Sequence, residues 1–318
     1  MFLSVCIFLL GLAVLSWSAD RFVYGASALA KNIGISPMMI GLTIVAMGSS
    51  APEIVVSAIA SANGNMNTAV GNVLGSNITN IALVLGATAL ISPLVVRSLT
   101  LKREFPVLLM VTMLAMLFLH NGSLTSVEGI ILLALFIFVL AAMAWISLEV
   151  DKEDPLVAET NSEIPSDVQT KHAVLWVGVG ILLLPLSAQF MVTAAVDIAH
   201  TFGISDLVIG LTIIALGTSL PELATSIAGV RKGESDLVLG NIIGSNIFNL
   251  LAVLGMPGLI APGLLDEDVY NRDMWVMFAL TVMLFFLSFN FIGKRELGRI
   301  EGGIFVLCFV AYQFWLFG

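Results

Sequence analysis

Charged side chains are scarce in this sequence. They make up 11% of its 318 residues, whereas hydrophobic residues reach 58%. Soluble domains carry about 25% charged residues, and the mean hydropathy here is +1.04, so an ordinary water-soluble fold is excluded. The net charge of −9 says little about partners, because many acidic residues lie in loops such as 149–167 and 266–273. We expect the lipid bilayer to surround the chain and no nucleic acid to bind it.

Cysteine and histidine are also rare. The two cysteines, Cys6 and Cys308, lie in apolar runs near opposite ends, and only three histidines occur. Two isolated thiols form neither a disulfide framework nor a thiolate metal cluster. We therefore expect no bound cofactor and no zinc or copper site.

The apolar residues come in runs long enough to cross a bilayer, which takes roughly 20 residues each. Backbone amides in lipid need internal partners, and runs such as 130–144 do not alternate like barrel strands. The sequence thus predicts an all-α membrane protein with ten transmembrane helices, at 2–28, 36–61, 68–92, 104–120, 125–148, 172–198, 205–229, 236–261, 273–292 and 300–317.

Lysine and arginine distribute unevenly between the two sides of this ten-span arrangement. Twelve of the thirteen fall on one side, and only Arg272 falls on the other. Loops rich in basic residues remain in the cytoplasm. The pattern predicts a multi-pass protein of the prokaryotic plasma membrane, with both termini outside and the 149–171 loop cytoplasmic.

The chain contains an internal repeat at an offset of 169 residues. Residues 41–86 and 210–255 share 21 identities in 46 positions without a gap. Generic apolar helices would not share GxSxPE and GNxxGSNxxN at the same spacing. We predict three segments, a first repeat at 1–148, a linker at 149–171 and a second repeat at 172–318.

Five spans in each half would make the second copy enter the membrane from the opposite face. Such inverted repeats are typical of secondary transporters, whose binding sites lie near the membrane midplane where the repeats meet. A duplication kept only for helix packing is the alternative, and glycines alone would fit it. The repeated glutamates do not.

Glu53 and Glu222 lie at equivalent positions in the middle of predicted spans. A carboxylate at that depth costs several kcal/mol unless another group neutralises it. A protonated or purely structural glutamate is possible at one such position. Two at equivalent positions predict a paired site.

Proline precedes each glutamate and predicts an interrupted helix. Pro52 and Pro221 cannot donate hydrogen bonds to the carbonyls of Gly48 and Gly217. We expect breaks at 48–52 and 217–221, with carbonyls near Ala46 and Ala215 free to bind a cation at the negative end of a half-helix. Hydroxyl groups follow in the same motifs, at Ser49, Ser50, Thr218 and Ser219.

A second polar stripe follows on the next predicted helix of each half. Its members are four residues apart and share one helix face. Interhelical hydrogen bonding is the alternative to lining the site. The stripes are Asn72, Ser76 and Asn80, and Asn241, Ser245 and Asn249.

Together these groups offer two carboxylates and several neutral oxygens. Hard oxygen ligands suit Na+, Ca2+ or Mg2+. Two negative charges balance one divalent or two monovalent cations, so Ca2+ and Na+ would compete for overlapping ligands. Such competition predicts obligatory exchange, since an empty site would hold two close carboxylates in a medium of low dielectric constant.

The motifs GSSAPE at 48–53 and GTSLPE at 217–222, each followed by GNxxGSNxxN, resemble the α-repeats of the sodium/calcium exchanger family. The resemblance implies electrogenic exchange of several Na+ for one Ca2+, with alternating access by sliding of the first and sixth helices. The short 149–171 loop has no room for Ca2+-sensing domains, so the chain resembles a minimal prokaryotic member.

The resemblance also implies ligand roles. Glu53 and Glu222 would bind Ca2+ with the backbone carbonyls of Ser49 and Thr218. Asn249 stands where many relatives have aspartate, which in the potassium-dependent branch is tied to K+ use, so we expect K+-independent exchange. The implied Na+ ligands are Ser50, Ser76, Ser219, Ser245 and the carbonyls of Ala46 and Ala215, and the remaining central positions are Asn80 and Asn249.

Three other functions remain open from the residues alone. A Ca2+/H+ antiporter would use the same glutamates, although a proton needs no cage of hydroxyl oxygens. An intramembrane protease would need paired aspartates or a GxSxG motif with histidine; the latter motif does not occur, and we expect no enzyme. A passive channel suits inverted repeats and broken helices less well than alternating access does. The sequence does not indicate an oligomeric state.

Overall fold

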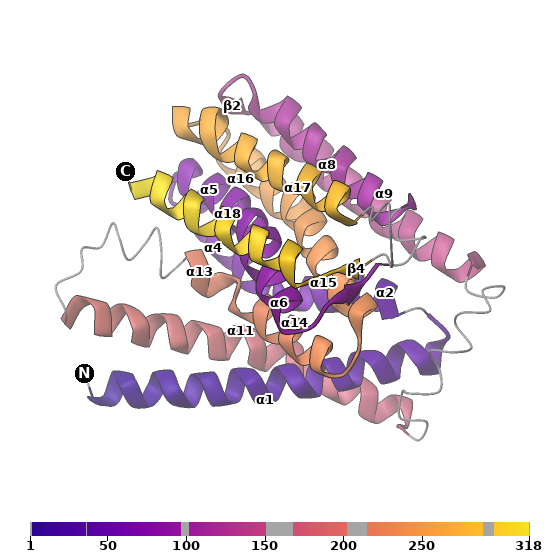
Figure 1. Ribbon diagram of the computed structural model, residues 1–318. Coiled ribbons are helices and arrows are strands. Elements are labelled where there is room, and N and C mark those ends of the chain that lie inside the picture. The colour runs from indigo at the N-terminus through magenta and orange to yellow at the C-terminus, as the bar shows by residue number, and fades with distance from the viewer. Residues whose placement is uncertain are drawn as a thin grey trace.

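The computed structural model describes residues 2–35, 37–96, 102–150, 168–201, 215–288 and 296–317, and almost all of them are helical (Figure 1). The first half begins with a long helix and continues through short helical segments. Its elements are α1 (Phe2–Ile33), α2 (Pro37–Ile40), π-helical η1 (Gly41–Val45), α3 (Ala46–Ser49), α4 (Ala51–Ala62), α5 (Met66–Thr79), π-helical η2 (Asn80–Leu85), α6 (Gly86–Ile91), β1 (Leu94–Val95), α8 (Glu104–Leu119), β2 (Ser123–Leu124) and α9 (Ser126–Val150).

The second half presents a similar order of elements. It also begins with a long helix, and its strands are again only two residues long. Its elements are α11 (Thr170–Thr201), α13 (Ala215–Thr218), α14 (Leu220–Arg231), α15 (Ser235–Phe248), π-helical η4 (Asn249–Val253), α16 (Leu254–Ile260), β3 (Gly263–Leu264), π-helical η5 (Val269–Asp273), α17 (Met274–Ser288), β4 (Glu296–Leu297) and α18 (Arg299–Phe317).

The sequence repeat is also a repeat of structure. α4 and α14 both have 12 residues, and α5 and α15 both have 14. Each longer helix passes into a π-helical segment that begins at an asparagine of the repeated motif. The same local sequence therefore produces the same order of helix, turn and widened helix in both halves.

Equivalent contacts join the two halves crosswise. β1 pairs with β4 and β2 pairs with β3, both antiparallel. A Cβ added at Gly86 would lie 3.0 Å from the Gly302 carbonyl, and one at Gly129 would lie 2.8 Å from the Gly255 carbonyl. Such reciprocal contacts are those of two copies related by a two-fold axis.

α1 and α11 lie side by side along one edge of the molecule (Figure 1). Gly11 of α1 packs against Met191 in the C-terminal half of α11, whereas Gly25 packs against Ala173 near its beginning. The two equivalent helices thus run antiparallel. Their glycines let the backbones approach closely, as is common where helices meet in membranes.

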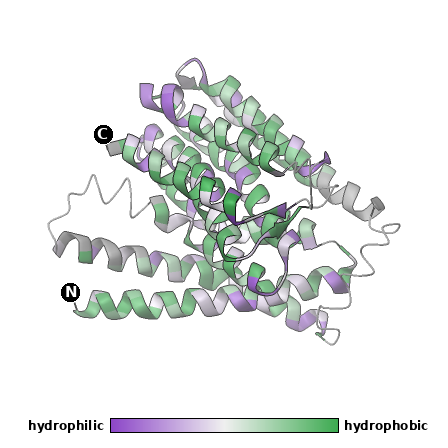
Figure 2. Ribbon diagram, in the orientation of Figure 1, coloured by the Kyte–Doolittle hydropathy of each residue, from purple (hydrophilic) through white to green (hydrophobic). Residues whose placement is uncertain are grey.

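The core is built around the stretch from Ser235 to Ile260, which is buried throughout the hydrophobic window of that span. The outer helices instead expose large apolar side chains, among them Phe138 and Phe314, which are 66% and 76% exposed. Hydropathy colouring shows apolar residues along the outer helices and hydrophilic ones mostly towards helix ends and loops (Figure 2). This is the surface of a helical membrane protein.

The described residues contain six helices long and apolar enough to cross a membrane, or seven with the bent pair Pro37–Ser49 and Pro52–Ala62. The helix Glu104–Leu119 and the stretch Ser126–Ala142 of α9 are apolar but have fewer than 18 residues. The predicted span 205–229 lies partly outside the described residues. The count of ten thus stays a prediction, since the length of these helices does not establish that each crosses alone.

Candidate ion-binding site

Each predicted site glutamate lies in the first turn of a helix that follows a break. Ser50 separates α3 from α4 with φ −83° and ψ 14°, and Ser219 separates α13 from α14 with φ −89° and ψ 6°. Proline occupies an early position of each new helix, where its missing N–H removes no helical hydrogen bond. In the first half the two segments are bent by 47°. Both interruptions fall within the segments predicted from proline.

Glu53 and Glu222 are completely buried. Their carboxylates are close enough to interact electrostatically, and each lies at a helix N-terminus, whose dipole favours negative charge. One oxygen of each, Oε2, has no hydrogen-bond partner. Two carboxylates distant in sequence therefore share one buried site, and each keeps an oxygen available.

The Glu222 carboxylate accepts hydrogen bonds from hydroxyl groups of both halves. Ser50 Oγ donates to Glu222 Oε1 at 2.8 Å, and Ser245 Oγ donates to the same atom at 3.4 Å. The two hydroxyl oxygens are 3.0 Å apart. The first-half motif thus contacts the second-half carboxylate directly, while the neighbouring Ser49 Oγ donates to Asn241 Oδ1 of the second half at 3.1 Å.

Glu53 has the reciprocal set of neighbours at longer range. Ser76 Oγ lies 3.5 Å from Glu53 Oε1, and Thr218 of the second half contacts the same carboxyl group. The Ser219 hydroxyl, equivalent to that of Ser50, has no partner. The site therefore follows the repeat in composition but not in every hydrogen bond.

The second stripe divides into two kinds of residue. Asn72 donates to the Glu53 carbonyl at 3.3 Å, and Asn241 donates to Thr225 Oγ1 at 3.0 Å. These two hold adjacent helices together, as the packing alternative predicted. Asn80 and Asn249 differ, because Oδ1 of each is buried without a partner.

Five of the buried oxygens without partners belong to the two repeated motifs. Each would cost about 1–3 kcal/mol if left unsatisfied, and oxygens of these kinds are the ligands that a hard cation prefers. Among the described residues, no group of three or more Asp, Glu, His or Cys side chains could hold a metal. A cation at this site would therefore be bound by two carboxylates together with neutral oxygens. These atoms are Glu53 Oε2, Glu222 Oε2, Asn80 Oδ1, Asn249 Oδ1 and Ser219 Oγ.

The backbone near the breaks is less open than the sequence predicted. The Ala46 carbonyl accepts the Ser50 N–H at 3.0 Å and lies 3.4 Å from Ser49 Oγ. A carbonyl oxygen has two lone pairs, so a cation would have to displace the hydroxyl. Ala215 opens α13, and Gly217 is buried beside it. Gly48 packs so closely on α11 that a Cβ would lie 2.9 Å from Ile181 Cγ1.

The glycines of α15 pack closely on the first half of the chain. A Cβ at Gly240 would lie 2.4 Å from the Met38 carbonyl, and one at Gly244 would lie 2.5 Å from the Leu42 carbonyl. Close approach to α2 and η1 therefore requires glycine at both positions. At Gly71 and Gly75 no described atom lies within 4 Å, and the segment equivalent to η1 lies outside the described residues.

Asn246 also lies at the site, although it was not among the residues expected there. It is completely buried, its Oδ1 accepts from Asn80 Nδ2 at 3.4 Å, and its own Nδ2 has no partner. Its equivalent, Asn77, turns away and donates to the Val73 carbonyl at 2.8 Å. Asn246 belongs to the repeated GNxxGSNxxN motif, so the repeat itself was the signal.

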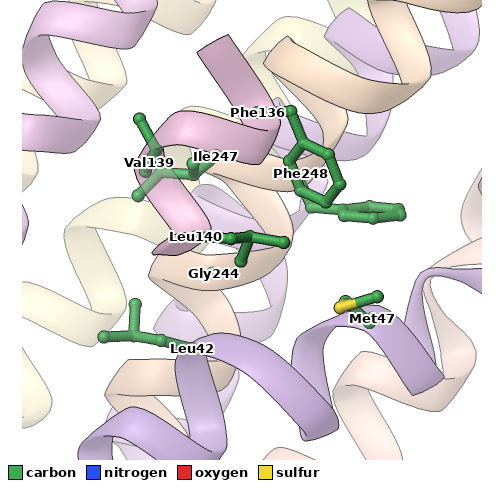
Figure 3. A pocket seen from close by; sticks show the side chains of 8 residues that line it. All are labelled: Leu42, Met47, Phe136, Val139, Leu140, Gly244, Ile247 and Phe248. Atoms are coloured by element: carbon green, nitrogen blue, oxygen red, sulfur yellow. The ribbon is translucent and has the colours of Figure 1, made fainter. Parts of the chain in front are cut away.

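A small cavity of about 10 Å³ lies between η1, α3, α9 and α15. Figure 3 shows only apolar residues around it, including Leu42, Met47 and Phe248. The space equals about one water-sized sphere, and the side chains that line it carry no oxygen atom. It is therefore separate from the polar site.

Comparison with known proteins agrees with this geometry. The family model of sodium/calcium exchanger proteins matches residues 3–145 and 172–318. The CaxA protein of Alkalimonas amylolytica, whose name classes it as an antiporter, is 54% identical over 100% of this chain and 99% of its own length. The inner membrane protein YrbG of Escherichia coli is 42% identical over 99% of this chain and 98% of its own.

A solved structure extends the similarity to three dimensions. The sodium-calcium exchanger NCX_Mj, soaked with Na+ and Ca2+, superposes with a TM-score of 0.84 at 32% sequence identity, covering 98% of this chain and 97% of that one. Family members are membrane transporters rather than enzymes. This chain belongs to the sodium/calcium exchanger family, as a prokaryotic-type cation/Ca2+ antiporter of the membrane.

Proposed function

We propose that this protein exchanges Na+ for Ca2+ by alternating access at the site between the two interrupted helices. The observation that carries the proposal is the set of buried, unpartnered oxygens around Glu53 and Glu222. Among the described residues, no basic side chain pairs with either carboxylate. Cations from solution are the groups that would complete the site.

The neighbours of each glutamate suggest how two kinds of ion would share ligands. Ca2+ needs both charges and takes six to eight oxygens, so it would bind Glu53 and Glu222 with the carbonyls of Ser49 and Thr218. Asn80 and Asn249 would complete the central positions. Na+ would use hydroxyls and carbonyls next to the same acids, namely Ser50, Ser76, Ser219, Ser245 and the carbonyls of Ala46 and Ala215.

We propose ten spans arranged as two inverted five-helix repeats, at 1–148 and 172–318, joined by a linker at 149–171. Antiparallel packing of the equivalent helices α1 and α11 supports the inversion, as do the crosswise strand pairs. The name of YrbG, an inner membrane protein, supports the plasma membrane as location. The distribution of basic residues supports outside termini and a cytoplasmic linker.

A Ca2+/H+ antiporter is the second candidate. Two buried carboxylates with one unpartnered oxygen each could also carry protons. The hydroxyl groups around them favour Na+, because a proton on a carboxylate needs only one acceptor whereas Na+ needs several oxygens. Asn249 in place of an aspartate further predicts exchange that does not require K+.

Calcium uptake into proteoliposomes separates these functions. We expect 45Ca2+ to enter vesicles loaded with Na+ when the pH is clamped with an ionophore, and the rate to be independent of K+. Uptake driven by a pH gradient without Na+ would establish the proton antiporter instead. Equal flux with no ion on the opposite side would indicate a channel, and an absolute need for K+ would contradict the role assigned to Asn249.

A further inference from the structure

The lipid-facing side of the first half contains an apolar groove between α8 and α9, with a volume of about 340 Å³. Arg103, directly before α8, lines it with Val107 and Leu114 of α8. Leu135 and Val139 line it from α9, and Leu251 lines it from η4. Residues 103 to 114 rise about 16 Å along a helix, which is about one leaflet of a 30 Å hydrocarbon core. The groove thus has the length and surface that suit an acyl chain.

The second half shows what fills the equivalent space. α9 and α18 correspond at an offset of 173 residues, since Glu128 binds the Thr125 N–H at 2.7 Å as Glu301 binds the Gly298 N–H at 3.0 Å. At this offset Tyr312 is the counterpart of Val139. The Tyr312 side chain is buried, so a large ring occupies the place where the first half has only valine.

The first turns of the equivalent helices α8 and α17 are flanked by equivalent ion pairs. Arg103 Nε lies 3.0 Å from Glu104 Oε1, and Arg272 Nε lies 2.8 Å from Asp273 Oδ1 at the start of the equivalent helix. Tyr312 Oη donates to Asp273 at 2.9 Å. In the first half, Val139 stands at the position equivalent to Tyr312, so no tyrosine hydroxyl reaches Glu104 from there. The Glu104 Oε2 atom has no hydrogen-bond partner.

Arg103 places a guanidinium group, paired with Glu104 through Nε, at the mouth of the groove. Its Nε is engaged by Glu104, which orients the guanidinium group, while its terminal amino groups make no hydrogen bond within the described part of the chain. Lys102 beside it is exposed. Arginine presents paired donors that match a phosphate group, and basic residues next to the membrane attract anionic lipids.

We propose that this groove, defined by α8, α9 and Leu251, is a binding site for one anionic phospholipid. An acyl chain lies against Val107, Leu114, Leu135 and Val139, and the lipid phosphate accepts hydrogen bonds from Arg103. The lipid takes the place that the Tyr312 ring takes in the second half. The proposal concerns a surface separate from the ion site and does not depend on which ions are exchanged.

Native mass spectrometry of the full-length protein tests the proposal. Phosphatidylglycerol and phosphatidylcholine with identical acyl chains are titrated into the detergent-solubilised protein. We expect one phosphatidylglycerol to bind about fivefold more tightly than phosphatidylcholine, the ratio that one basic residue near the surface contributes. Equal binding of the two lipids, or no lipid retained above detergent, would overturn the proposal.

Two tyrosine substitutions in α9 test whether the lipid lies in the groove. Val139→Tyr places in the groove the side chain that the second half uses, and it should abolish the retained phosphatidylglycerol. Ile137→Tyr is the matched control, since Ile137 lies on the same helix and is 69% exposed, and it should leave lipid binding intact. Unchanged binding in Val139→Tyr would show that the lipid lies elsewhere.

A second pair of variants tests the head group without changing the groove. The double variant Arg103→Gln with Glu104→Gln removes both charges and avoids a buried unpaired carboxylate, and it should bind the two lipids equally. Glu104→Gln alone keeps the arginine and should keep the fivefold preference. A preference that survives in the double variant would contradict the role of Arg103.

Discussion

The two halves carry nearly the same motifs around their glutamates, yet they form different hydrogen bonds. Ser50 donates to Glu222 at 2.8 Å, whereas its counterpart Ser219 has no partner. Ser57 donates to the Ala69 carbonyl at 3.2 Å, whereas its counterpart Ser226 has none. Equal sequence therefore does not produce an equal environment.

This difference has a physical explanation in the arrangement of the helices. The hydroxyl groups are the same in both halves, so only their placement relative to the opposite half can decide which of them is engaged. If the protein alternates between two states as proposed, the second-half hydroxyls would become engaged when the first-half ones are released. The hydrogen bonds that differ between the two halves in this structure would then also differ between the two conformations of the protein.

Removal of a site carboxylate should have the largest effect. Glu53→Gln and Glu222→Gln each take one of two charges from a buried site, and such losses cost about 3 kcal/mol or more, roughly 100-fold in flux. Na+-driven 45Ca2+ uptake measures the effect. Glu128→Gln, which changes only a helix cap at Thr125, is the control, and near-normal uptake in either site variant would refute the paired site.

The next largest difference should be between alanine substitutions of the two serines at the helix breaks, Ser50 and Ser219. Ser50→Ala removes a hydrogen bond to a carboxylate and should lower the free energy of unfolding by about 1.5–3 kcal/mol. Ser219→Ala removes a buried hydroxyl without a partner, so it should raise the free energy of unfolding by up to about 1–3 kcal/mol or leave it unchanged. Thermal unfolding in detergent without Na+ or Ca2+ measures both. Equal losses would mean that the two hydroxyls are equivalent in the resting protein.

Two helical glycines should show a smaller contrast. Gly240→Ala places a Cβ 2.4 Å from the Met38 carbonyl, and such overpacking costs about 1–3 kcal/mol of the free energy of unfolding. Gly178→Ala changes an exposed glycine of α11 with no described atom within 4 Å, and it should gain up to about 1 kcal/mol of helix propensity. The unfolding temperatures of the two variants test this, and a loss at Gly178 as large as that at Gly240 would contradict the close packing of α15 on the first half.

Much of the site could be predicted from the sequence because the repeat marked it. Two copies of a glutamate after a proline identified both the buried acids and the interrupted helices. The repeated asparagines identified the second stripe, but not that Asn72 and Asn241 bind neighbouring helices while Asn80 and Asn249 keep free oxygens. Asn246 was overlooked although the same motif contains it.

Other features had no signal in the sequence. The π-helical segments that begin at Asn80 and Asn249 widen the helix at the site, and such segments are frequent at functional sites. No local propensity distinguishes them from α-helix. The groove between α8 and α9 could not be predicted either, because the sequence does not distinguish Val139 from other lipid-facing residues. Only the structure shows that Tyr312 is buried at the equivalent position of the second half.

The sequence by itself determined that this is a helical membrane protein with a duplicated acidic motif, because apolar run length and repeat spacing are properties of the chain alone. The tertiary structure alone decided which hydroxyl meets which carboxylate and which oxygens are left without partners. These depend on distances between side chains more than 160 residues apart, which packing of the two halves sets and no local pattern encodes.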